Sequence, residues 1–329
     1  MKDVNDGMKK ILVAPPLDGE RLRLFAERVK EKCAGFDCEF MMNTQGGVTV
    51  EEIAEANAII GTVSPKKLAA AKKLELLQLT SAGADAHSAP GVVDESVLLC
   101  NCAGAYGTSV SEWMLAVTFS LIRHLDGYMK NQAAKKWESL GRVISIEDST
   151  VLVLGLGDIG GRYARAVKAM GAHVIGIRRT EKAKPEYLDE QYTIESLLSV
   201  VGRADIIAMV LPGGRQTEHL FDEKLFGLCK NGAYIINAGR GNAIDPAALK
   251  NALKSGRIAG AGLDVTEPEP LPADDELWTM DNVVITPHIA GWFFLEKTFD
   301  NVAEIASNNI AHWLKGEPAD HVVNRKTGY

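Results

Sequence analysis

Short apolar runs alternate with helix-like segments along almost the whole chain. Over the first hundred residues the apolar runs lie at 10–14, 38–42, 58–61, 74–79 and 97–101, and the helix-like segments lie at 20–32, 50–57 and 65–73. When strands and helices alternate in this way, the strands pair in parallel and the helices cover both faces of the sheet. The alternation therefore predicts a parallel α/β domain at the start of the chain.

The same pattern starts again after a helix expected at 110–124 and a polar stretch that reaches Thr150. From there the expected strands are 151–154, 173–177, 205–211, 233–237, 262–265 and 283–286, and the expected helices are 159–170, 194–200, 223–229 and 246–254. Residues 293–315 contain no Gly or Pro and carry apolar residues at helical spacing, which predicts an amphipathic closing helix. We therefore expect an α/β chain with two doubly wound parallel-sheet domains.

Two of these helices begin with the same signature, a capping residue followed by proline: Ser64-Pro65 and Asp245-Pro246. A Ser or Asp side chain can accept hydrogen bonds from the free N–H groups of the first turn, and proline has no N–H group to leave unbonded. We therefore expect side-chain caps at both positions.

The size and charge of the chain restrict its partners. Its 329 residues suffice for two domains, and 46% hydrophobic with 24% charged residues is the composition of an ordinary globular protein. The 36 basic and 43 acidic residues give a net charge of −7 and form no long run of either sign. Because nucleic acids and anionic membranes need a basic surface, we expect neither as a partner.

Three further features predict a cytoplasmic protein. The first ten residues are too polar for the apolar core of a secretory signal. The most apolar long window, 110–122, is short and contains Glu112, so we expect no membrane span. The cysteines match neither a disulfide framework nor a zinc pattern, so we expect buried free thiols and no bound metal: Cys33, Cys38, Cys100, Cys102 and Cys229.

The strand expected at 151–154 runs directly into the sequence Gly155-Leu156-Gly157-Asp158-Ile159-Gly160 and then into a helix. In this context the first glycine permits a tight turn, the second lets the backbone approach a pyrophosphate, and the third lets the helix pack on the strand. The N-terminus of the helix then faces the phosphates. The turn predicts a dinucleotide site, and a glycine-rich connection without a ligand is the alternative.

The end of the next strand bears on the choice of cofactor. An Asp or Glu there would accept a hydrogen bond from the adenosine ribose 2′-hydroxyl and would repel a 2′-phosphate. This chain instead has Arg178, Arg179 and Thr180, and arginine binds a phosphate bidentately. We therefore expect NADP(H) to be preferred, with NAD(H) as the alternative if these residues are only a solvated strand end.

Three later strands are each followed by a polar residue of catalytic type. Arg240 lies in Ala238-Gly239-Arg240-Gly241, Glu269 lies between two prolines, and His288 lies in Pro287-His288-Ile289-Ala290-Gly291. An arginine can bind a substrate carboxylate, and a histidine can give a proton to a developing alkoxide. A glutamate bonded to the histidine would raise the pKa of the histidine. Together these residues are suited to hydride transfer to a 2-oxo acid.

These motifs and their order resemble the D-isomer-specific 2-hydroxyacid dehydrogenase family, over essentially the full chain. The matching segments are 153–160 (VLGLGDIG), 236–241 (INAGRG), 263–272 (LDVTEPEPLP) and 286–291 (TPHIAG). The resemblance implies that Arg240 binds the substrate, that Glu269 is the partner of the histidine, and that His288 is the catalytic acid/base.

Further site residues are implied by the same resemblance. Ser81, Ala82 and Gly83 belong to a loop whose backbone amides hold the substrate carboxylate. Asp264 is expected beside the nicotinamide, and Leu211 with Pro212 on the adenine side. The full set implied to contact the cofactor is Gly155, Leu156, Gly157, Asp158, Ile159, Gly160, Arg178, Arg179, Thr180, Leu211, Pro212, Ala238, Gly239, Asp264 and Gly291.

The resemblance also implies how the chain is divided. A Rossmann dinucleotide-binding domain, residues 103–291, is expected as an insertion in a flavodoxin-like substrate domain made of residues 1–102 and 292–329. The helix from Phe293 would then return to the substrate domain. Members of this family are usually homodimers joined through their nucleotide-binding domains, so we expect a homodimer.

Several residues depart from the usual pattern of the family. Arg178 stands where the NAD-using members have Asp, as in the NADP-dependent glyoxylate/hydroxypyruvate reductases. Trp292-Phe293-Phe294 is bulkier than usual and would either narrow the substrate pocket or, as we favour, belong to the core. Tyr106 would either contact the substrate, as we assign it, or only pack nearby. The chain stops soon after the closing helix, which argues against a feedback-regulated phosphoglycerate dehydrogenase.

The sequence thus predicts an oxidoreductase that uses NADPH to reduce a small 2-oxo acid, of the glyoxylate or hydroxypyruvate type, to the D-2-hydroxy acid. An NAD-linked D-lactate or phosphoglycerate dehydrogenase is the alternative among enzymes. A nucleotide-sensing binding protein, like the transcriptional corepressors that share this fold, is the alternative of another class.

Overall fold

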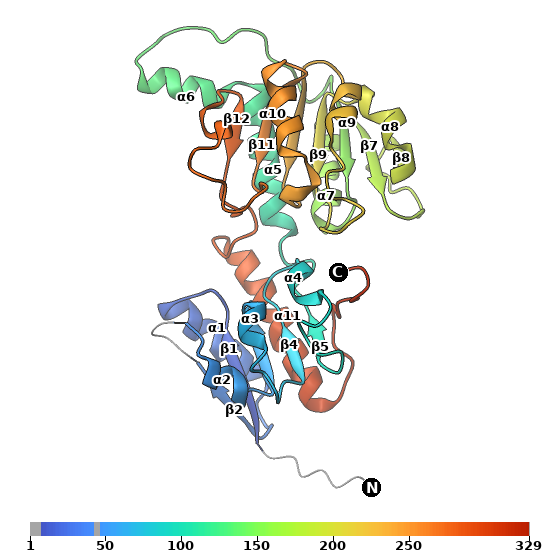
Figure 1. Cartoon of the computed structure of the whole chain (residues 1–329). Coiled ribbons are helices and arrows are strands. Elements are labelled where there is room, and N and C mark those ends of the chain that lie inside the picture. Colours follow the sequence, from blue (N-terminus) through green and yellow to red (C-terminus); the bar gives the residue numbers. More distant parts are fainter. Residues whose placement is uncertain (1–7, 43–46, 329) are drawn as a thin grey trace. The chain divides into compact units, whose positions relative to one another are not determined.

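The computed structural model describes residues 8–42 and 47–328. Residues 1–7, part of the segment judged too polar for a secretory signal, lie outside the described residues. The chain divides into two compact units, the first ending at Tyr106 and resuming at Phe293, the second spanning Gly107–Trp292 (Figure 1). The first unit includes Tyr106, whose hydroxyl donates to Thr80 O.

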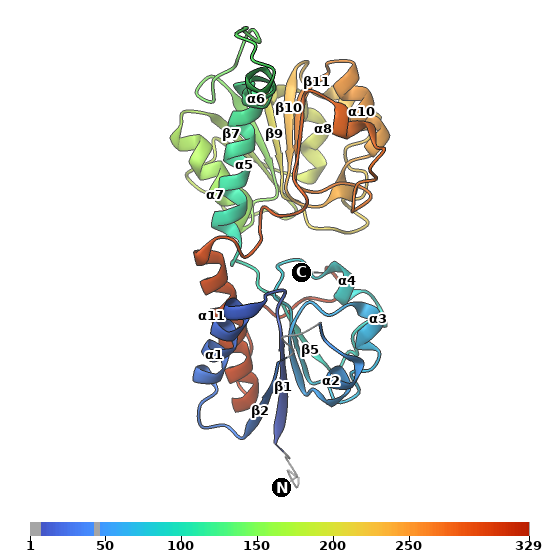
Figure 2. The same cartoon turned by 90° about the vertical axis from the view of Figure 1, so that its left-hand side faces the viewer.

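The first unit contains a five-stranded parallel sheet in the order β2-β1-β3-β4-β5, which is the flavodoxin-like order. Helices α1 and α11 pack together on one face, and α2 and α3 lie on the other (Figure 2). The strands are β1 (Lys9–Ala14), β2 (Cys38–Met41), β3 (Ala58–Gly61), β4 (Leu76–Gln78) and β5 (Leu98–Cys100). The helices are α1 (Gly19–Lys32), α2 (Val50–Glu55), α3 (Pro65–Leu68), α4 (Asp85–Ser88) and α11 (Glu296–Lys315).

The second unit contains a seven-stranded parallel sheet in the order β12-β11-β10-β9-β6-β7-β8. Its strands are β6 (Thr150–Leu154), β7 (His173–Arg178), β8 (Glu190–Thr193), β9 (Ile206–Met209), β10 (Ala233–Asn237), β11 (Ile258–Leu263) and β12 (Val283–Ile285). Counted from β6, this is the doubly wound Rossmann order with one added strand. The neighbouring strands β6 and β9 form the switch point, beside which such sheets bind nucleotides.

Helices cover both faces of this second sheet (Figure 2). On one face α5 (Gly107–Ile122) packs against α7 (Asp158–Ala169), and on the other α9 (Glu223–Leu228) packs against α10 (Pro246–Lys254), with α8 (Leu197–Val200) nearby. Short 3₁₀ turns lie at Ile194–Ser196, Val201–Arg203, Gly241–Ala243 and Glu276–Thr279. The two sheets confirm the predicted α/β chain with two parallel-sheet units.

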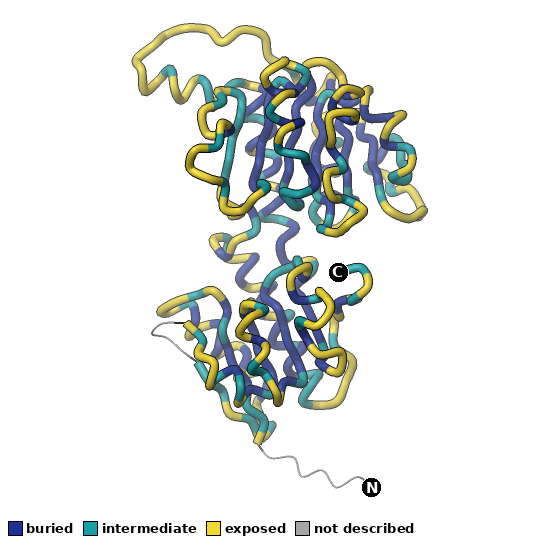
Figure 3. The backbone as a smooth tube through the Cα atoms, in the orientation of Figure 1, coloured by how far each residue is buried: buried dark blue, intermediate teal, exposed yellow. Residues whose placement is uncertain are grey.

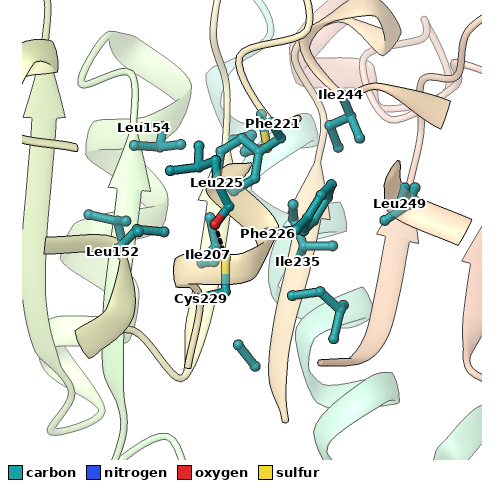
Figure 4. Packing of buried hydrophobic residues seen from close by; sticks show 14 of the residues in the cluster. Leu152, Leu154, Ile207, Phe221, Leu225, Phe226, Cys229, Ile235, Ile244 and Leu249 are labelled. Atoms are coloured by element: carbon teal, nitrogen blue, oxygen red, sulfur yellow. Dashed lines mark hydrogen bonds between the residues drawn. The ribbon is translucent and has the colours of Figure 1, made fainter. Parts of the chain in front are cut away.

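The core of the second unit joins side chains from the strands to side chains from α9 and α10 (Figure 4). Leu152, Ile207 and Ile235 of the strands are fully buried there, beside Phe226 and Leu249 of the helices. Burying such a side chain contributes about 1.5–3 kcal/mol. The central strands are therefore buried along their length, whereas α6 (Leu125–Ala133) has no buried residue (Figure 3).

Several elements differ from the expectations: α3 ends at Leu68 rather than at residue 73, and the short α4 was not predicted. Strand β8 was not predicted because Glu190 and Gln191 are polar; as an edge strand it has one neighbour and is only half-buried. Helix α6 forms inside the polar stretch before Thr150, where no helix was predicted. Strand β11 begins four residues before the expected strand at 262, and its glycines allow close packing: a Cβ at Gly262 would lie 2.2 Å from Val117 of α5.

The two cap signatures behave differently. Asp245 Oδ1 accepts hydrogen bonds from the N–H groups of Ala247 (2.8 Å) and Ala248 (3.0 Å), as predicted. Ser64 precedes a helix with proline in its first turn, but its side chain forms no cap, so that prediction is wrong. The backbone oxygen of Ser64 instead accepts from Lys67 N (2.9 Å) and Leu68 N (3.2 Å), and Pro65 has no N–H group to satisfy.

The cysteines are free, as predicted. Four of them are buried, and burial raises the pKa of each to about 12: Cys33, Cys100, Cys102 and Cys229. Cys38 is half-buried. Among the helices that the structure describes, none combines the length and apolarity that crossing a membrane would require.

Candidate active site

The turn after β6 shows why each of its glycines is needed. Gly155 has φ +95°, and a Cβ there would lie 2.5 Å from Val210 O. A Cβ at Gly160 would lie 1.9 Å from Gly155 O, so α7 can pack on the strand only without a side chain. At Gly157 no atom lies within 4 Å of the Cβ position. The space beside Gly157, just before α7, is thus open to a phosphate group and fits the predicted dinucleotide site.

The other residues of this turn have different surroundings. A Cβ at Gly176 of β7 would lie 2.7 Å from Leu156 Cδ1, so Leu156 packs against β7. Asp158 Oδ1 accepts a hydrogen bond from Arg162 Nε at 2.7 Å within α7. Ile159 is half-buried. The negative charge of Asp158 is therefore paired within the helix.

The end of β7 carries positive charge. Arg178 is the last residue of the strand, is half-buried, and donates from Nη1 to Gln191 Oε1 of β8 at 3.4 Å. Gln191 Nε2 also donates to Lys182 O at 2.6 Å, which ties the loop after β7 to β8. Arg179 and Thr180 follow Arg178 and are exposed.

The loops after β9 and β10 are in contact. Leu211 is buried and Pro212 is half-buried. Ala238 N donates to Met209 O at 3.0 Å, and a Cβ at Gly239 would lie 2.6 Å from Leu211 O. Predicted cofactor residues from two loops are thus brought together at the carboxyl edge of the sheet.

The loop that carries Arg240 is held by a residue that the motifs did not single out. Asn237 is buried at the end of β10; its Oδ1 accepts from Gly239 N at 3.0 Å and its Nδ2 donates to Arg240 O at 2.9 Å. A Cβ at Gly241 would lie 1.8 Å from Thr266 O, so this loop also packs on the loop after β11. Arg240 itself is half-buried and donates from Nη1 to Gly239 O at 2.8 Å.

The loops after β11 and β12 bring Glu269 and His288 together. His288 Nδ1 lies 3.0 Å from Glu269 Oε2, and Glu269 Oε1 accepts from Thr266 N at 3.1 Å. The hydrogen bond that His288 donates to Glu269 raises the pKa of His288; attraction from Glu269 and Asp264 adds to this effect, while burial and Arg240 oppose it. Partial burial acts to raise the pKa of Glu269, but the bond and charge of His288 outweigh it and the pKa of Glu269 is lowered.

Asp264 organises the loop that carries His288. Its Oδ1 accepts from the Thr286 hydroxyl (2.6 Å) and from Ile289 N (2.9 Å), and its Oδ2 accepts from Ala290 N (3.0 Å). Its backbone oxygen accepts from His288 N at 2.8 Å. The carboxylate expected beside the nicotinamide is thus buried and bonded to its own loop, where it positions His288, and the half-buried Gly291 follows directly.

The first unit places the predicted substrate loop after β4. Ser81 Oγ donates to Gly83 O (2.7 Å), Cys102 N donates to Ser81 O (2.9 Å), and Asn101 Nδ2 donates to Ala82 O (2.8 Å). These bonds use the carbonyls of the loop. Across residues 8–42 and 47–328, no hydrogen bond engages the N–H groups of Ala82 or Gly83, which leaves them available for an anion.

Tyr106 lies inside the first unit rather than on an open surface. It is 8% exposed, its hydroxyl donates to Thr80 O, and burial raises its pKa. The Tyr106 hydroxyl is thus bonded to the backbone just before the Ser81–Gly83 loop, and the substrate contact assigned to Tyr106 stays a prediction.

The aromatic run after the histidine motif is divided between core and surface. Phe293 is 5% exposed and belongs to the core, as favoured for the whole run. Trp292 is 40% exposed and Phe294 is 72% exposed, so the core assignment is wrong for these two. Within the described part of the chain, no cluster of three or more His, Cys, Asp or Glu side chains could hold a metal ion.

Comparison with known proteins agrees with this geometry. The family model described as "D-isomer specific 2-hydroxyacid dehydrogenase, NAD binding domain" matches residues 115–290. The chain is 33% identical over 287 residues to a probable 2-ketogluconate reductase of Dictyostelium discoideum, covering 83% of this chain and 84% of that protein.

Two solved structures are similar over nearly the whole chain. One is a D-isomer specific 2-hydroxyacid dehydrogenase family protein from Aeromonas salmonicida, with 31% identity, a TM-score of 0.84, and coverage of 97% of this chain and 100% of that chain. The other is an NADPH-dependent glyoxylate/hydroxypyruvate reductase from Sinorhizobium meliloti, in complex with NADP and sulfate, with 26% identity, a TM-score of 0.81, and coverage of 98% and 100%. Sequence and fold together show that the chain belongs to the D-isomer specific 2-hydroxyacid dehydrogenase family of NAD(P)-dependent oxidoreductases.

Proposed function

We propose that the protein reduces a small 2-oxo acid, of the glyoxylate or hydroxypyruvate type, to the D-2-hydroxy acid with NADPH. The observation that carries this proposal is the 3.0 Å contact between His288 Nδ1 and Glu269 Oε2 in the loops after β12 and β11. Arg240 lies in the loop after β10, which packs on the loop after β11. The three side chains thus come from one edge of one sheet, where such folds bind their ligands.

The side chains divide the chemistry as follows. The Arg240 guanidinium in the second unit and the N–H groups of Ala82 and Gly83 in the first unit are each suited to bind a carboxylate group. A bound nicotinamide supplies the hydride to C2. His288 in its imidazolium form gives a proton to the oxygen at C2, and Glu269 favours that form by accepting the Nδ1 hydrogen bond. Asp264 keeps His288 in place through its bonds to the 286–290 loop.

The preference for NADP over NAD rests on the end of β7. Arg178 and Arg179 offer two guanidinium groups where a carboxylate would repel a 2′-phosphate, and Thr180 adds a hydroxyl. Gln191 holds the side chain of Arg178 from β8. The structure of the Sinorhizobium meliloti relative contains NADP, which supports the same preference here.

We also propose the domain roles and a homodimer. The second unit binds the dinucleotide, and the first binds the substrate carboxylate.

A second copy of the chain would cover the apolar side chains that α6 and the segment after it expose: Leu125, Tyr128, Met129, Trp137 and Leu140. Trp137→Glu should then lower the molecular mass in sedimentation from that of a dimer to that of a monomer.

The decisive experiment is the initial rate of NADPH and of NADH oxidation with glyoxylate, hydroxypyruvate and pyruvate. Faster loss of NADPH with one of these acids is expected and would rank the substrates. Faster loss of NADH would favour the NAD-linked alternative and leave the arginines at the end of β7 without a role. No turnover with any acid would contradict the proposed reaction.

A further inference from the structure

The loop that carries Glu269 also carries a glutamate that pairs with another histidine. His219 Nε2 is 2.6 Å from Glu267 Oε2, and Glu267 precedes Glu269 by two residues in the same loop. The side chains are partly exposed, at 43% for His219 and 35% for Glu267. The mechanism proposed above uses neither residue.

This pair spans the loop that carries Arg240. His219 follows β9, Glu267 follows β11, and Arg240 follows the strand between them, β10. His219 N donates to Asn242 O at 2.7 Å, two residues after Arg240. On the other side, the backbone of Gly241 packs so closely on Thr266 that a Cβ would lie 1.8 Å from Thr266 O. The His219–Glu267 pair therefore closes a connection across three neighbouring loops.

We propose that His219 and Glu267 are positioning residues, which hold Arg240 and Glu269 in the geometry that the reaction needs. The inference rests on the proposed function, because it assigns the pair a purpose in that reaction. Only Pro268 separates Glu267 from Glu269, so a Glu267 that is bonded to His219 restricts where the Glu269 carboxylate can lie. The hydrogen bond between His219 and Glu267 also spans the backbone of the loop that carries Arg240 and limits the movement of that loop.

The charge state of His219 fits this role. The hydrogen bond that His219 donates to Glu267 raises the pKa of His219; attraction from Glu267, Asp245 and Glu218 adds to this effect, while desolvation opposes it. Asp245 faces it from the start of α10 and Glu218 from its own loop. Because the pKa is raised, the ion pair persists at a pH where a free histidine would be neutral, and it weakens as the pH rises through the raised pKa.

The test uses two variants of the full-length protein. His219→Asn removes the contact and retains a residue that tolerates the φ of +46° found at this position. Glu267→Ala removes the other partner. Each variant should raise the KM for glyoxylate by about tenfold, and the double variant should be no worse than either single one, as expected for residues that act as a pair. Glu267→Gln keeps an acceptor for His219 and should restore part of the loss.

Two readouts separate positioning from a general loss of stability. The pH at which kcat falls should move lower in both single variants, since Glu269 then supports the charge of His288 less well. Amide hydrogen exchange of residues 239–243 and 266–270 should become faster, and this measurement does not depend on turnover. Lys254→Ala is the matched control, because it removes the exposed 2.7 Å ion pair with Glu276 in the same unit and should change none of these values.

The possible outcomes test the positioning role of His219 and Glu267 separately from the proposed reaction. Unchanged exchange of both segments in His219→Asn and Glu267→Ala would overturn the inference, whatever the activity. So would wild-type values of KM and an unmoved pH profile in an active enzyme. Inactivity of the wild-type protein toward every 2-oxo acid, together with faster exchange in the variants, would overturn the proposed function and keep the positioning contact.

Discussion

The two units present different chemical groups at the carboxyl ends of similar parallel sheets. In the first unit, the Ser81–Gly83 loop offers backbone N–H groups, because its carbonyls and hydroxyl are bonded within the unit. In the second unit, the loops offer the charged side chains of Arg240, Glu269 and His288. The first unit thus presents N–H dipoles, whereas the second presents a guanidinium that stays charged and two side chains, Glu269 and His288, that can gain or lose a proton.

Both units hold the loops proposed to bind ligands (the binding loops) in the same way, through a buried asparagine at or just after the end of a strand. Asn101 follows β5 and is 3% exposed; Asn237 ends β10 and is 1% exposed. Each Oδ1 accepts from the N–H group two residues later, at Ala103 and Gly239. Each Nδ2 donates to a carbonyl of the binding loop. The two loops thus differ in chemistry and share their support.

The largest effect is expected for His288, which gives a proton to the substrate oxygen in the proposed reaction. His288→Asn removes the acid and keeps a residue that tolerates the φ of +54°. The kcat for reduction should fall by about 10²–10⁴-fold, the usual contribution of general acid catalysis. NADPH binding, measured by fluorescence titration, should stay unchanged. Weakened NADPH binding with normal kcat at saturating cofactor would contradict the role of His288.

In the proposed phosphate-binding turn after β6, the second unit depends on backbone geometry rather than on charged side chains. Gly160→Ala places a methyl group 1.9 Å from Gly155 O and should destabilise the unit by about 1–3 kcal/mol or more. Gly157→Ala meets no atom within 4 Å and should leave the unfolding midpoint nearly unchanged. It should still raise the Kd for NADPH by about tenfold, a loss of about 1.4 kcal/mol, by blocking the phosphate. Equal effects of both variants on stability would refute this distinction.

The two asparagines allow a direct test of their shared support. Asn101→Ala and Asn237→Ala each leave a buried N–H group and a carbonyl without their partner, which should cost about 1–3 kcal/mol in urea unfolding. The kinetic results should differ: Asn101→Ala should raise the KM for the 2-oxo acid, and Asn237→Ala should also lower kcat through Arg240. Identical kinetic changes would mean that the units do not divide the work as we describe.

The sequence predicted the elements whose own residues determine them. Strands Ala58–Gly61 and Ala233–Asn237 and helix Pro246–Lys254 have the bounds that were expected, because each is an apolar or amphipathic run that ends at turn-forming residues. Strand β8 escaped prediction because an edge strand needs only one neighbour and tolerates polar residues such as Glu190. In the site, Arg240, Glu269 and His288 were predictable from their motifs, and the structure brings the last two into contact.

The supporting residues could not be predicted in the same way. Asn101 is needed because Ala82 O, 19 residues earlier, requires a donor, and His219 meets Glu267 across 48 residues. Such pairs depend on which loops become neighbours in the folded sheet. For Asn237, a signal was present: a polar residue ends an otherwise apolar strand, at the edge where ligands bind.

A smaller effect is expected on the pH dependence of kcat, which arises from the His288–Glu269 pair of the second unit. Because the pKa of His288 is raised above its ordinary value near 6.5, kcat for reduction should be constant at low pH and fall as the pH rises through that raised pKa. The stabilisation from the pair should be lost over the same rise, since it is fully present only below the unfolded pKa. Glu269→Gln should move the fall in kcat to lower pH, as a pH–rate profile would show. A profile that does not move would separate Glu269 from the proton transfer.

The smallest effect is expected for Tyr106, whose hydroxyl bonds to Thr80 O just before the Ser81–Gly83 loop of the first unit. Tyr106→Phe keeps the buried ring and removes the hydrogen bond to Thr80 O, which should cost about 0.5–1.5 kcal/mol of stability. Because the hydroxyl supports the loop and the ring is buried, kcat should be unchanged and the KM for the 2-oxo acid should rise only slightly. A loss of kcat with unchanged thermal stability would instead mean that the hydroxyl contacts the substrate. The first unit would then contribute a side chain to the reaction, and the contrast between the two units would no longer hold.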